Sequence, residues 1–144
     1  MASRTARTAW HGTVSQGAGQ VELTSSGAGT FEVSFPQRVA EKAEVTSPEE
    51  LIAAALSSCY AMQFSALIGE AGGTPVALEI RADVSIGADP AGGLRIPVIA
   101  LTVHGEVEGL DADGFVRVAQ AAKETCPVSK ALAGTTITLV AALD

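Results

Sequence analysis

The feature that most restricts the fold of this chain is a long apolar helix signal that begins at Ser47. Ser47 is a suitable N-cap, Pro48 suits the first helical position, and Glu50 stands where it can close a capping box. The following residues are apolar or small on nearly every face as far as Glu70, where Gly72-Gly73 ends the run. We therefore expect a helix that is buried all round, against a sheet on one side and a partner element on the other.

Segments on both sides of this helix alternate apolar and polar residues, as strands do. Pro36 is expected to end the third strand of an N-terminal β-meander, and residues 37–46 to form a charged loop. A helix is expected at residues 110–124, with Asp111 or Asp113 as its cap. The predicted strands lie within residues 5–35, at 76–86 and 94–106 as a hairpin, and at 135–143. With no repeat or linker in this order, we predict a single α+β domain over residues 1–144.

Composition excludes two classes of partner. The chain has 144 residues, of which 47% are hydrophobic and 17% charged, which is typical of a globular protein. Its net charge is −7 and its nine basic residues are scattered, so no nucleic-acid partner is expected. Because the N-terminus lacks an apolar signal and no apolar run is expected to be long enough to span a bilayer, we expect no membrane association and a cytoplasmic location.

The two cysteines, Cys59 and Cys126, allow two interpretations. Cys59 falls in the middle of the apolar helix, where an inert buried thiol is common. Cys126 precedes Pro127 and would be the N-cap of a new helix, a position that lowers a thiol pKa and is usually open to solvent. The pair is therefore either two structural thiols or a dithiol that cycles through a transient disulfide in a reducing compartment.

No metal site is predicted, because the chain has no CxxC motif and its two histidines fall in expected strands. The histidines are His11 and His104.

A reactive thiol in this setting needs a cation, because a free cysteine is only a few per cent thiolate at neutral pH and burial lowers that fraction. Arg38 is the natural candidate, held by the carboxylate of Glu49 or Glu50, although these residues could equally be a solvated loop charge and helix caps. Glu49 and Cys59 are separated by roughly 15 Å along a straight helix. If all these residues serve one site, Arg38 and Glu49 come from a second subunit, so we predict a homodimer with shared active sites.

Two sequence blocks together resemble the OsmC/Ohr family of thiol-dependent hydroperoxide reductases. The blocks run from Ser47-Pro48-Glu49-Glu50 to Ser58-Cys59-Tyr60, with Glu70-Ala71-Gly72 after them, and include Cys126-Pro127-Val128-Ser129. The resemblance covers nearly the whole chain from Trp10-His11-Gly12 onward and favours the OsmC branch. It implies an OsmC-like α+β fold with antiparallel sheets, a long central buried helix and an intertwined homodimer.

The resemblance also implies an activity, with Cys59 as the peroxidatic nucleophile and Cys126 as the resolving thiol. Arg38 would bind the peroxide and Glu49, rather than Glu50, would be the active-site glutamate. An organic hydroperoxide would be reduced to an alcohol through a Cys59 sulfenic acid and a Cys59–Cys126 disulfide, in defence against oxidative or osmotic stress. The reductant would be a dithiol or a lipoylated protein, with no metal or nicotinamide cofactor.

Three apolar side chains near Cys59 could set a preference for organic peroxides, although such residues are more often core. They are Tyr60, Met62 and Phe64.

Two other functions stay open from the residues themselves. The chain could be a non-enzymatic module that binds a small ligand or acts in stress with structural thiols, or a redox sensor without turnover. Thiol titration separates these, since a peroxidase loses both thiols to about one equivalent of hydroperoxide whereas inert thiols react only on unfolding.

Overall fold

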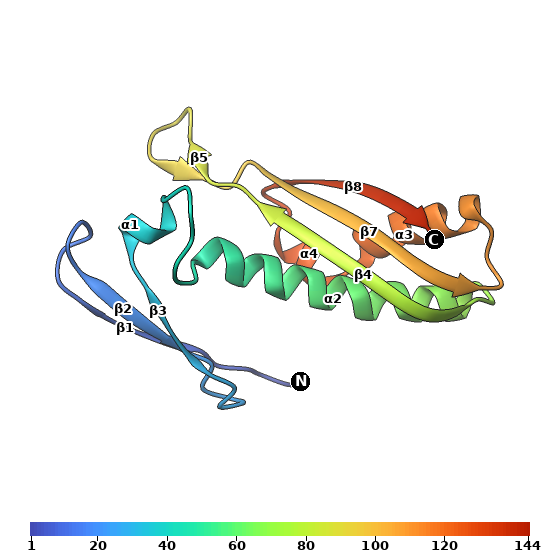
Figure 1. The fold of residues 1–144 in the computed structure, drawn as a ribbon, viewed down its shortest axis with the longest axis horizontal. Helices are drawn as coiled ribbons and strands as arrows, with labels where there is room; N and C mark the ends of the chain where they lie inside the picture. Colours follow the sequence, from blue (N-terminus) through green and yellow to red (C-terminus); the bar gives the residue numbers. More distant parts are fainter. The chain divides into compact units, whose positions relative to one another are not determined.

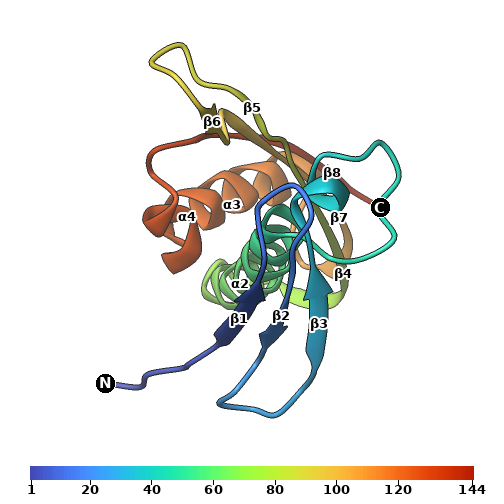
Figure 2. The same cartoon turned by 90° about the vertical axis from the view of Figure 1, so that its left-hand side faces the viewer.

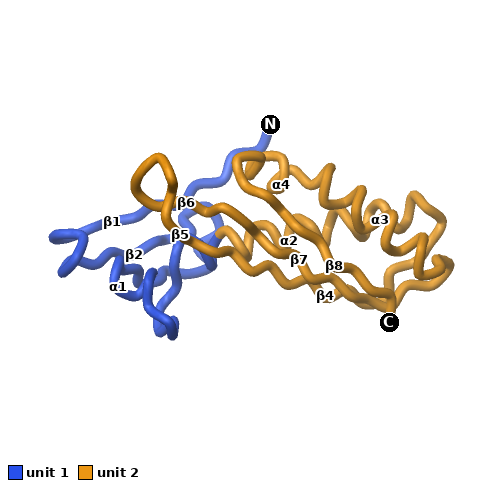
Figure 3. The backbone as a smooth tube through the Cα atoms, turned by 90° about the horizontal axis from the view of Figure 1, so that it is seen from above, with its two compact units in different colours: residues 1–51 blue, residues 52–144 orange.

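The computed structural model describes residues 1–144, which form two compact units (Figure 3). The first unit is Met1–Leu51 and the second is Ile52–Asp144. Each unit is described by itself below.

The first unit contains the predicted β-meander. Strands β1 (Arg7–His11), β2 (Ala18–Glu22) and β3 (Thr30–Val33) pair antiparallel in the order β1-β2-β3. Trp10, Val21 and Phe31 are large apolar residues of this sheet, and the register places Val21 opposite Phe31, so these two side chains share a face. Val21 is buried, whereas Trp10 and Phe31 keep part of their surface exposed.

A short helix replaces part of the predicted loop after β3. The strand ends at Val33 rather than at Pro36, and helix α1 covers Phe35–Arg38. Ser34 is its N-cap and accepts a hydrogen bond from the backbone N–H of Gln37 at 3.4 Å, while Pro36 lies in its first turn. Proline suits that turn because the missing N–H would have no partner there. Arg38 is therefore in the last turn of a helix and not in a loop.

Helix α2 (Pro48–Glu70) is the predicted long helix. The Ser47 hydroxyl accepts a hydrogen bond from the Glu50 N–H at 3.1 Å, as an N-cap does. The capping box does not close, because the Glu50 carboxylate accepts from the Thr46 hydroxyl at 2.6 Å instead. At the other end, Gly72 has φ +88° and the N–H of Gly73 donates to the carbonyl of Ile68 at 2.9 Å, a Schellman ending that needs glycine.

The second unit is a three-stranded sheet with the helices on one of its faces (Figure 1). Strand β4 (Thr74–Val84) pairs antiparallel with β7 (Val98–Glu108), which confirms the predicted hairpin. Between them, β5 (Gly87–Ala88) and β6 (Leu94–Arg95) form a small ribbon that extends beyond the sheet (Figure 2). Helices α3 (Ala112–Thr125) and α4 (Pro127–Ala131) lead to the last strand, β8 (Thr136–Leu143). Asp111 is the N-cap of α3.

The last strand departs from the expected antiparallel pairing, because β8 runs parallel to β7. Two helices separate these strands in the sequence, and a helical connection returns the chain to the same end of the sheet before the next strand begins. The sheet is therefore mixed, in the order β4-β7-β8.

One face of α2 packs into the core of the second unit. Leu56, Tyr60, Phe64 and Ile68 recur at helical spacing, are fully buried, and belong to one core cluster with residues of α3 and β7. The rings of Phe64 and Phe115 meet edge to face at 5.1 Å between centroids. This aromatic pair joins α2 to α3.

Another side of α2 is exposed in the single chain, so the expectation of burial all round is wrong for one copy. We call this surface the open face of α2; its residues are Ala54, Ala55, Ser58, Met62 and Ala66. By length and composition alone α2 could also cross a membrane, which corrects the expectation that no apolar run is long enough. Core helices of soluble proteins meet the same criterion, and α2 contributes a full row of side chains to a protein core.

Candidate active site

The two thiols lie against each other within the second unit. Cys59 is on α2 and Cys126 lies between α3 and α4, and both are free. Their Sγ atoms are 3.0 Å apart and share a hydrogen bond. A disulfide has an S–S distance of about 2.05 Å, so a small movement would allow the bond to form.

Cys126 is held by two helix ends at once. Its N–H donates to the carbonyl of Ala122 at 2.9 Å, which ends α3, and its carbonyl accepts from the N–H of Lys130 at 3.0 Å, which begins α4. Pro127 breaks the first helix and starts the second. The Gln63 amide donates to the Thr125 hydroxyl at 2.8 Å and ties α2 to the end of α3, one residue before Cys126.

The exposures of the two thiols are the reverse of the sequence expectation. Cys126 is fully buried, with 0% exposure, whereas Cys59 is only partly buried. Cys126 is enclosed because it belongs to the core cluster formed with residues of α2, α3 and β7. Cys59 is more open because it lies beside the open face of α2. Solvent and reagents therefore reach the pair from the Cys59 side.

The pKa values of the two thiols shift in opposite directions. Burial raises the pKa of Cys59, and its hydrogen bond with Cys126 raises it further. Burial also acts to raise the pKa of Cys126, but hydrogen bonds from Cys59, from the amide and hydroxyl of Ser129 and from the amide of Val128 outweigh it and lower that pKa. No cation is among the groups that act on either sulfur.

In the first unit the structure brings together Arg38 and Glu49. The Arg38 Nε donates to both carboxylate oxygens, at 2.9 and 3.1 Å, and its Nη2 donates to Oε1 at 2.7 Å. Glu49 is 6% exposed, whereas the Arg38 side chain is 32% exposed. Glu50 takes no part in this pair. The guanidinium is thus fixed in one plane with part of its surface open.

The three apolar residues considered for substrate preference do not act as one group. Tyr60 and Phe64 are fully buried in the core, and the Tyr60 hydroxyl donates to the carbonyl of Ala119 at 2.7 Å. Burial raises the pKa of Tyr60, so its phenol stays protonated. Only Met62, which is 73% exposed on the open face of α2, could contact a substrate.

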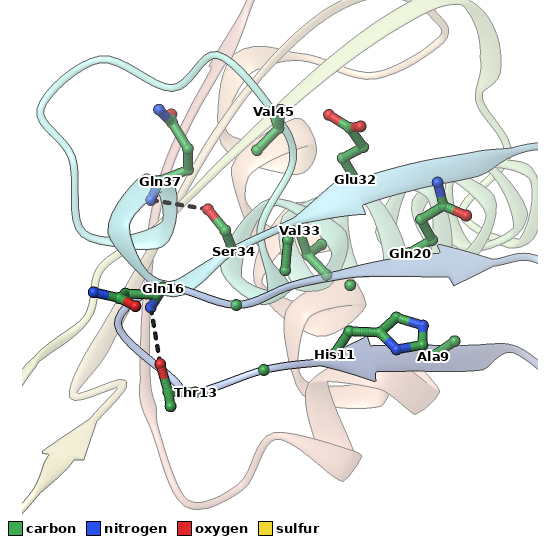
Figure 4. Close-up of a pocket in the computed structure, with 14 residues that line it drawn as sticks. Ala9, His11, Thr13, Gln16, Gln20, Glu32, Val33, Ser34, Gln37 and Val45 are labelled. Atoms are coloured by element: carbon green, nitrogen blue, oxygen red, sulfur yellow. Dashed lines mark hydrogen bonds between the residues drawn. The ribbon is translucent and has the colours of Figure 1, made fainter.

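One hollow of the first unit is lined by none of the expected site residues. It measures about 900 Å³ and lies over the meander and α1 (Figure 4). His11 and Gln20 come from the strands that line it, and Gln37 comes from α1. No three His, Cys, Asp or Glu side chains of the chain come close enough together to hold a metal ion.

Comparison with known proteins assigns the chain to a family. The family described as OsmC-like protein matches residues 41–140, a range that includes Glu49, Cys59 and Cys126. The chain belongs to the OsmC family. Peroxiredoxin OsmC of Escherichia coli (strain K12) is 40% identical to this OsmC-family chain over 123 residues, which is 85% of each protein. The protein of the same name from Shigella flexneri has the same identity and coverage.

Solved structures agree with this assignment. The organic hydroperoxide resistance protein OhrB of Bacillus subtilis is 27% identical, with a TM-score of 0.74, and the match covers 95% of this OsmC-family chain and 97% of that one. An OsmC-like protein of unknown function from Vibrio cholerae has a TM-score of 0.77 at 18% identity, covering 98% and 99%, and shows the fold alone. The predicted family and the predicted OsmC-like α+β fold are confirmed.

One residue near the thiols was missed by reasoning from the sequence. Ser129, three positions after Cys126, is 8% exposed and its hydroxyl is among the groups that lower the pKa of Cys126. The signal that could have found it is its position. Ser129 is the third residue of a helix whose N-cap is Cys126, and a side chain at that position can reach back toward the N-cap residue.

Proposed function

We propose that this OsmC-family protein reduces organic hydroperoxides to alcohols, as a peroxidase-type enzyme in defence against oxidative or osmotic stress. The observation that carries the proposal is the 3.0 Å distance between the Sγ atoms of Cys59 and Cys126. Two inert core thiols have no need to meet, whereas a dithiol cycle requires it. The names peroxiredoxin and organic hydroperoxide resistance protein among its relatives support the same activity.

In this proposal the Cys59 thiolate attacks the terminal oxygen of the hydroperoxide. The O–O bond breaks, the alkoxide takes a proton and leaves as an alcohol, and Cys59 becomes a sulfenic acid. The Cys126 thiolate then attacks the Cys59 sulfur, the S–O bond breaks, and water leaves as the disulfide forms. A dithiol, free or on a lipoylated protein, returns both cysteines to thiols and is itself oxidised to a disulfide.

Arg38 is the proposed cation of the site and Glu49 the residue that holds it. Cys59 needs a cation because its pKa is raised and no cation acts on it within its own unit. The bidentate pair with Glu49 leaves part of the guanidinium free to stabilise a thiolate and the departing alkoxide. Because Glu49 and Cys59 are roughly 15 Å apart along α2, we assign Arg38 and Glu49 of each site to a second copy of the chain.

A homodimer also accounts for the open face of α2. Its small and apolar residues form a helix surface without a partner in the single chain, and such a surface marks an interaction site. A second copy that covered part of it would line the approach to Cys59 without closing it. We place the enzyme in the cytoplasm, where reduced dithiols are available.

The deciding experiment measures hydroperoxide consumption with dihydrolipoamide as reductant. Wild type should consume cumene hydroperoxide, and a parallel assay with hydrogen peroxide ranks the two substrates. Cys59→Ser should abolish consumption because the nucleophile is lost. Cys126→Ser should still form the Cys59 sulfenic acid, detectable with dimedone, but no disulfide. The chain has no other thiol, so each signal belongs to one of these two cysteines.

The outcomes separate the competing functions. A redox sensor would lose both thiols to one equivalent of peroxide but would not turn over with the dithiol. A binding module would keep both thiols until it is unfolded. Consumption by Cys59→Ser at the wild-type rate would contradict the proposal.

A further inference from the structure

The Ser129 hydroxyl is the one buried side-chain oxygen or nitrogen without a hydrogen-bond partner. Burying an unpaired hydroxyl costs stability, because the group loses its bonds to water and gains none. Ser129 is 8% exposed at the third position of helix α4, whose N-cap is Cys126, and its hydroxyl forms no hydrogen bond although it is among the groups that lower the pKa of Cys126. An unpaired hydroxyl near Cys126, whose sulfur would change charge during the proposed dithiol cycle, indicates that Ser129 acts in one step of that cycle.

The groups around the Cys126 sulfur can stabilise a thiolate without the help of a cation. The amides of Val128 and Ser129, which lie in the first turn of α4, lower the pKa of this sulfur, as the Ser129 hydroxyl does. The ammonium of Lys123, on the last turn of α3, is occupied elsewhere, because it donates to the carbonyl of Ile137 at 3.1 Å. Neutral donors are therefore the groups that can stabilise negative charge on Cys126.

Access to the two sulfurs is unequal. Cys126 is fully buried, so a thiol from solution cannot approach its sulfur, whereas Cys59 is partly open. In thiol–disulfide exchange the sulfur that is not attacked leaves as a thiolate, and it leaves faster when its pKa is lower. The lower pKa belongs to Cys126. The exposures of the two sulfurs and their pKa values therefore both favour an exchange in which Cys59 is attacked and Cys126 leaves as the thiolate.

We propose that the reductant attacks the disulfide at Cys59 and that the Ser129 hydroxyl donates a hydrogen bond to the departing Cys126 thiolate. This inference rests on the proposed dithiol cycle and adds its direction and a further catalytic residue. The reductant thiolate forms a bond to the Cys59 sulfur while the Cys59–Cys126 bond breaks and its electron pair goes to Cys126. The second thiol of the reductant then attacks the mixed disulfide, and the Cys59 thiolate is released.

The direction is tested by trapping the mixed disulfide. The protein is oxidised with diamide, so that the result does not depend on reaction with peroxide, and is then treated with 2-mercaptoethanol, quenched with acid, unfolded and labelled with N-ethylmaleimide. Peptide mass spectrometry should find mercaptoethanol on Cys59 and the maleimide on Cys126. The reverse labelling would overturn the proposal. If diamide closes the disulfide but a hydroperoxide does not, the proposed peroxidase function fails while the direction of exchange is still measured.

The role of Ser129 is tested with Ser129→Ala. Reduction of the diamide-generated disulfide by dihydrolipoamide should slow about ten-fold, because a hydrogen bond to a charged group is lost. Ser129→Thr, which keeps the hydroxyl, should recover most of the rate. Ser57→Ala is the matched control, since the Ser57 hydroxyl donates to the carbonyl of Ala54 within its own helix, and it should reduce at the wild-type rate.

A structural role for Ser129 predicts a different result. Removing an unpaired buried hydroxyl should leave the melting temperature unchanged or raise it, so slower reduction in a protein of undiminished stability would locate the effect in the reaction. The pKa of Cys126, followed by the ultraviolet absorbance of its thiolate in a Cys59→Ser background, should also rise in Ser129→Ala, because a donor that lowers it is gone. Wild-type reduction rates in Ser129→Ala would overturn the assignment.

Discussion

Arg38 differs from the other arginine that forms a bidentate ion pair in this chain by the burial of its partner. Glu49 is 6% exposed and must keep a counter-ion, whereas the pair between Arg81 and Asp83 is exposed to solvent. An exposed pair contributes little to stability, but a carboxylate held inside the protein fixes the plane and position of its arginine. We therefore expect the Arg38 guanidinium to be oriented to bind an anion. Arg81, whose ion pair is exposed, is the matched control.

Replacing Arg38 should change how the oxidation of Cys59 depends on pH. Burial raises the pKa of Cys59, so in Arg38→Gln less thiolate is present at neutral pH and the oxidation rate should fall about ten-fold or more. The rate should recover as the pH rises toward the raised pKa. Stopped-flow oxidation by cumene hydroperoxide across pH measures this effect. Arg81→Gln should keep the wild-type profile, and an unchanged profile in Arg38→Gln would exclude Arg38 from the site.

At the residue scale the sequence predicted the identities of the candidate site residues better than their surroundings. The family resemblance selected Glu49 over Glu50, and the structure pairs Glu49 with Arg38. The exposures of Cys59 and Cys126 were not predictable, because they depend on how α3 and α4 enclose one sulfur and leave the other beside the open face of α2. The local pattern around each cysteine contains no information on such packing.

Helices α2 and α3 are joined by two side-chain hydrogen bonds close to the thiols in sequence. The Tyr60 hydroxyl bonds to the carbonyl of Ala119 in the core, and Gln63 bonds to Thr125 in a more exposed position. Because Cys59 is adjacent to Tyr60 in sequence, the buried bond also fixes the distance between the two thiol-bearing segments.

Tyr60→Phe should lower the free energy of unfolding by about 1 kcal/mol, since a buried hydrogen bond is lost while the ring stays packed. Gln63→Ala removes an exposed bond between the same helices and should cost less than half as much. Urea denaturation of both variants measures the difference. Equal losses would show that burial does not set the strength of these bonds.

At the element scale the helix starts were the most predictable features. Ser47 and Asp111 bear side-chain oxygens at helix starts, and both act as N-caps. Helix α1 was missed because Pro36 suits a strand end as well as a first helical turn. The parallel direction of β8 could have been predicted from the two helices between β7 and β8, but it has no signal within the strand itself.

At the scale of the whole molecule, the open face of α2 bears on whether a single chain can form a complete active site. It exposes small and apolar side chains along several turns, beside the accessible edge of the thiol pair. A second copy is the partner that also supplies Arg38 and Glu49 in the proposed mechanism.

A charge on the open face of α2 should break the proposed dimer. Ala55→Glu places a carboxylate in the contact, so the variant should sediment as a monomer and lose peroxidase activity together with its Arg38 partner. Thr102→Glu, at an exposed position of β7, should remain a dimer. Sedimentation velocity at micromolar concentration measures both, and a monomeric wild type would contradict the shared site.

The junction between α3 and α4 has a mechanical consequence. Cys59 stands in the middle of an unbroken 23-residue helix, whereas Cys126 stands at the point where one helix stops and another starts. A continuous helix resists local displacement, and a break between two helices yields more readily. The proposed nucleophile thus lies on a rigid support and the proposed resolving thiol lies at a break between helices, so we expect closure of the disulfide to move the Cys126 segment rather than α2.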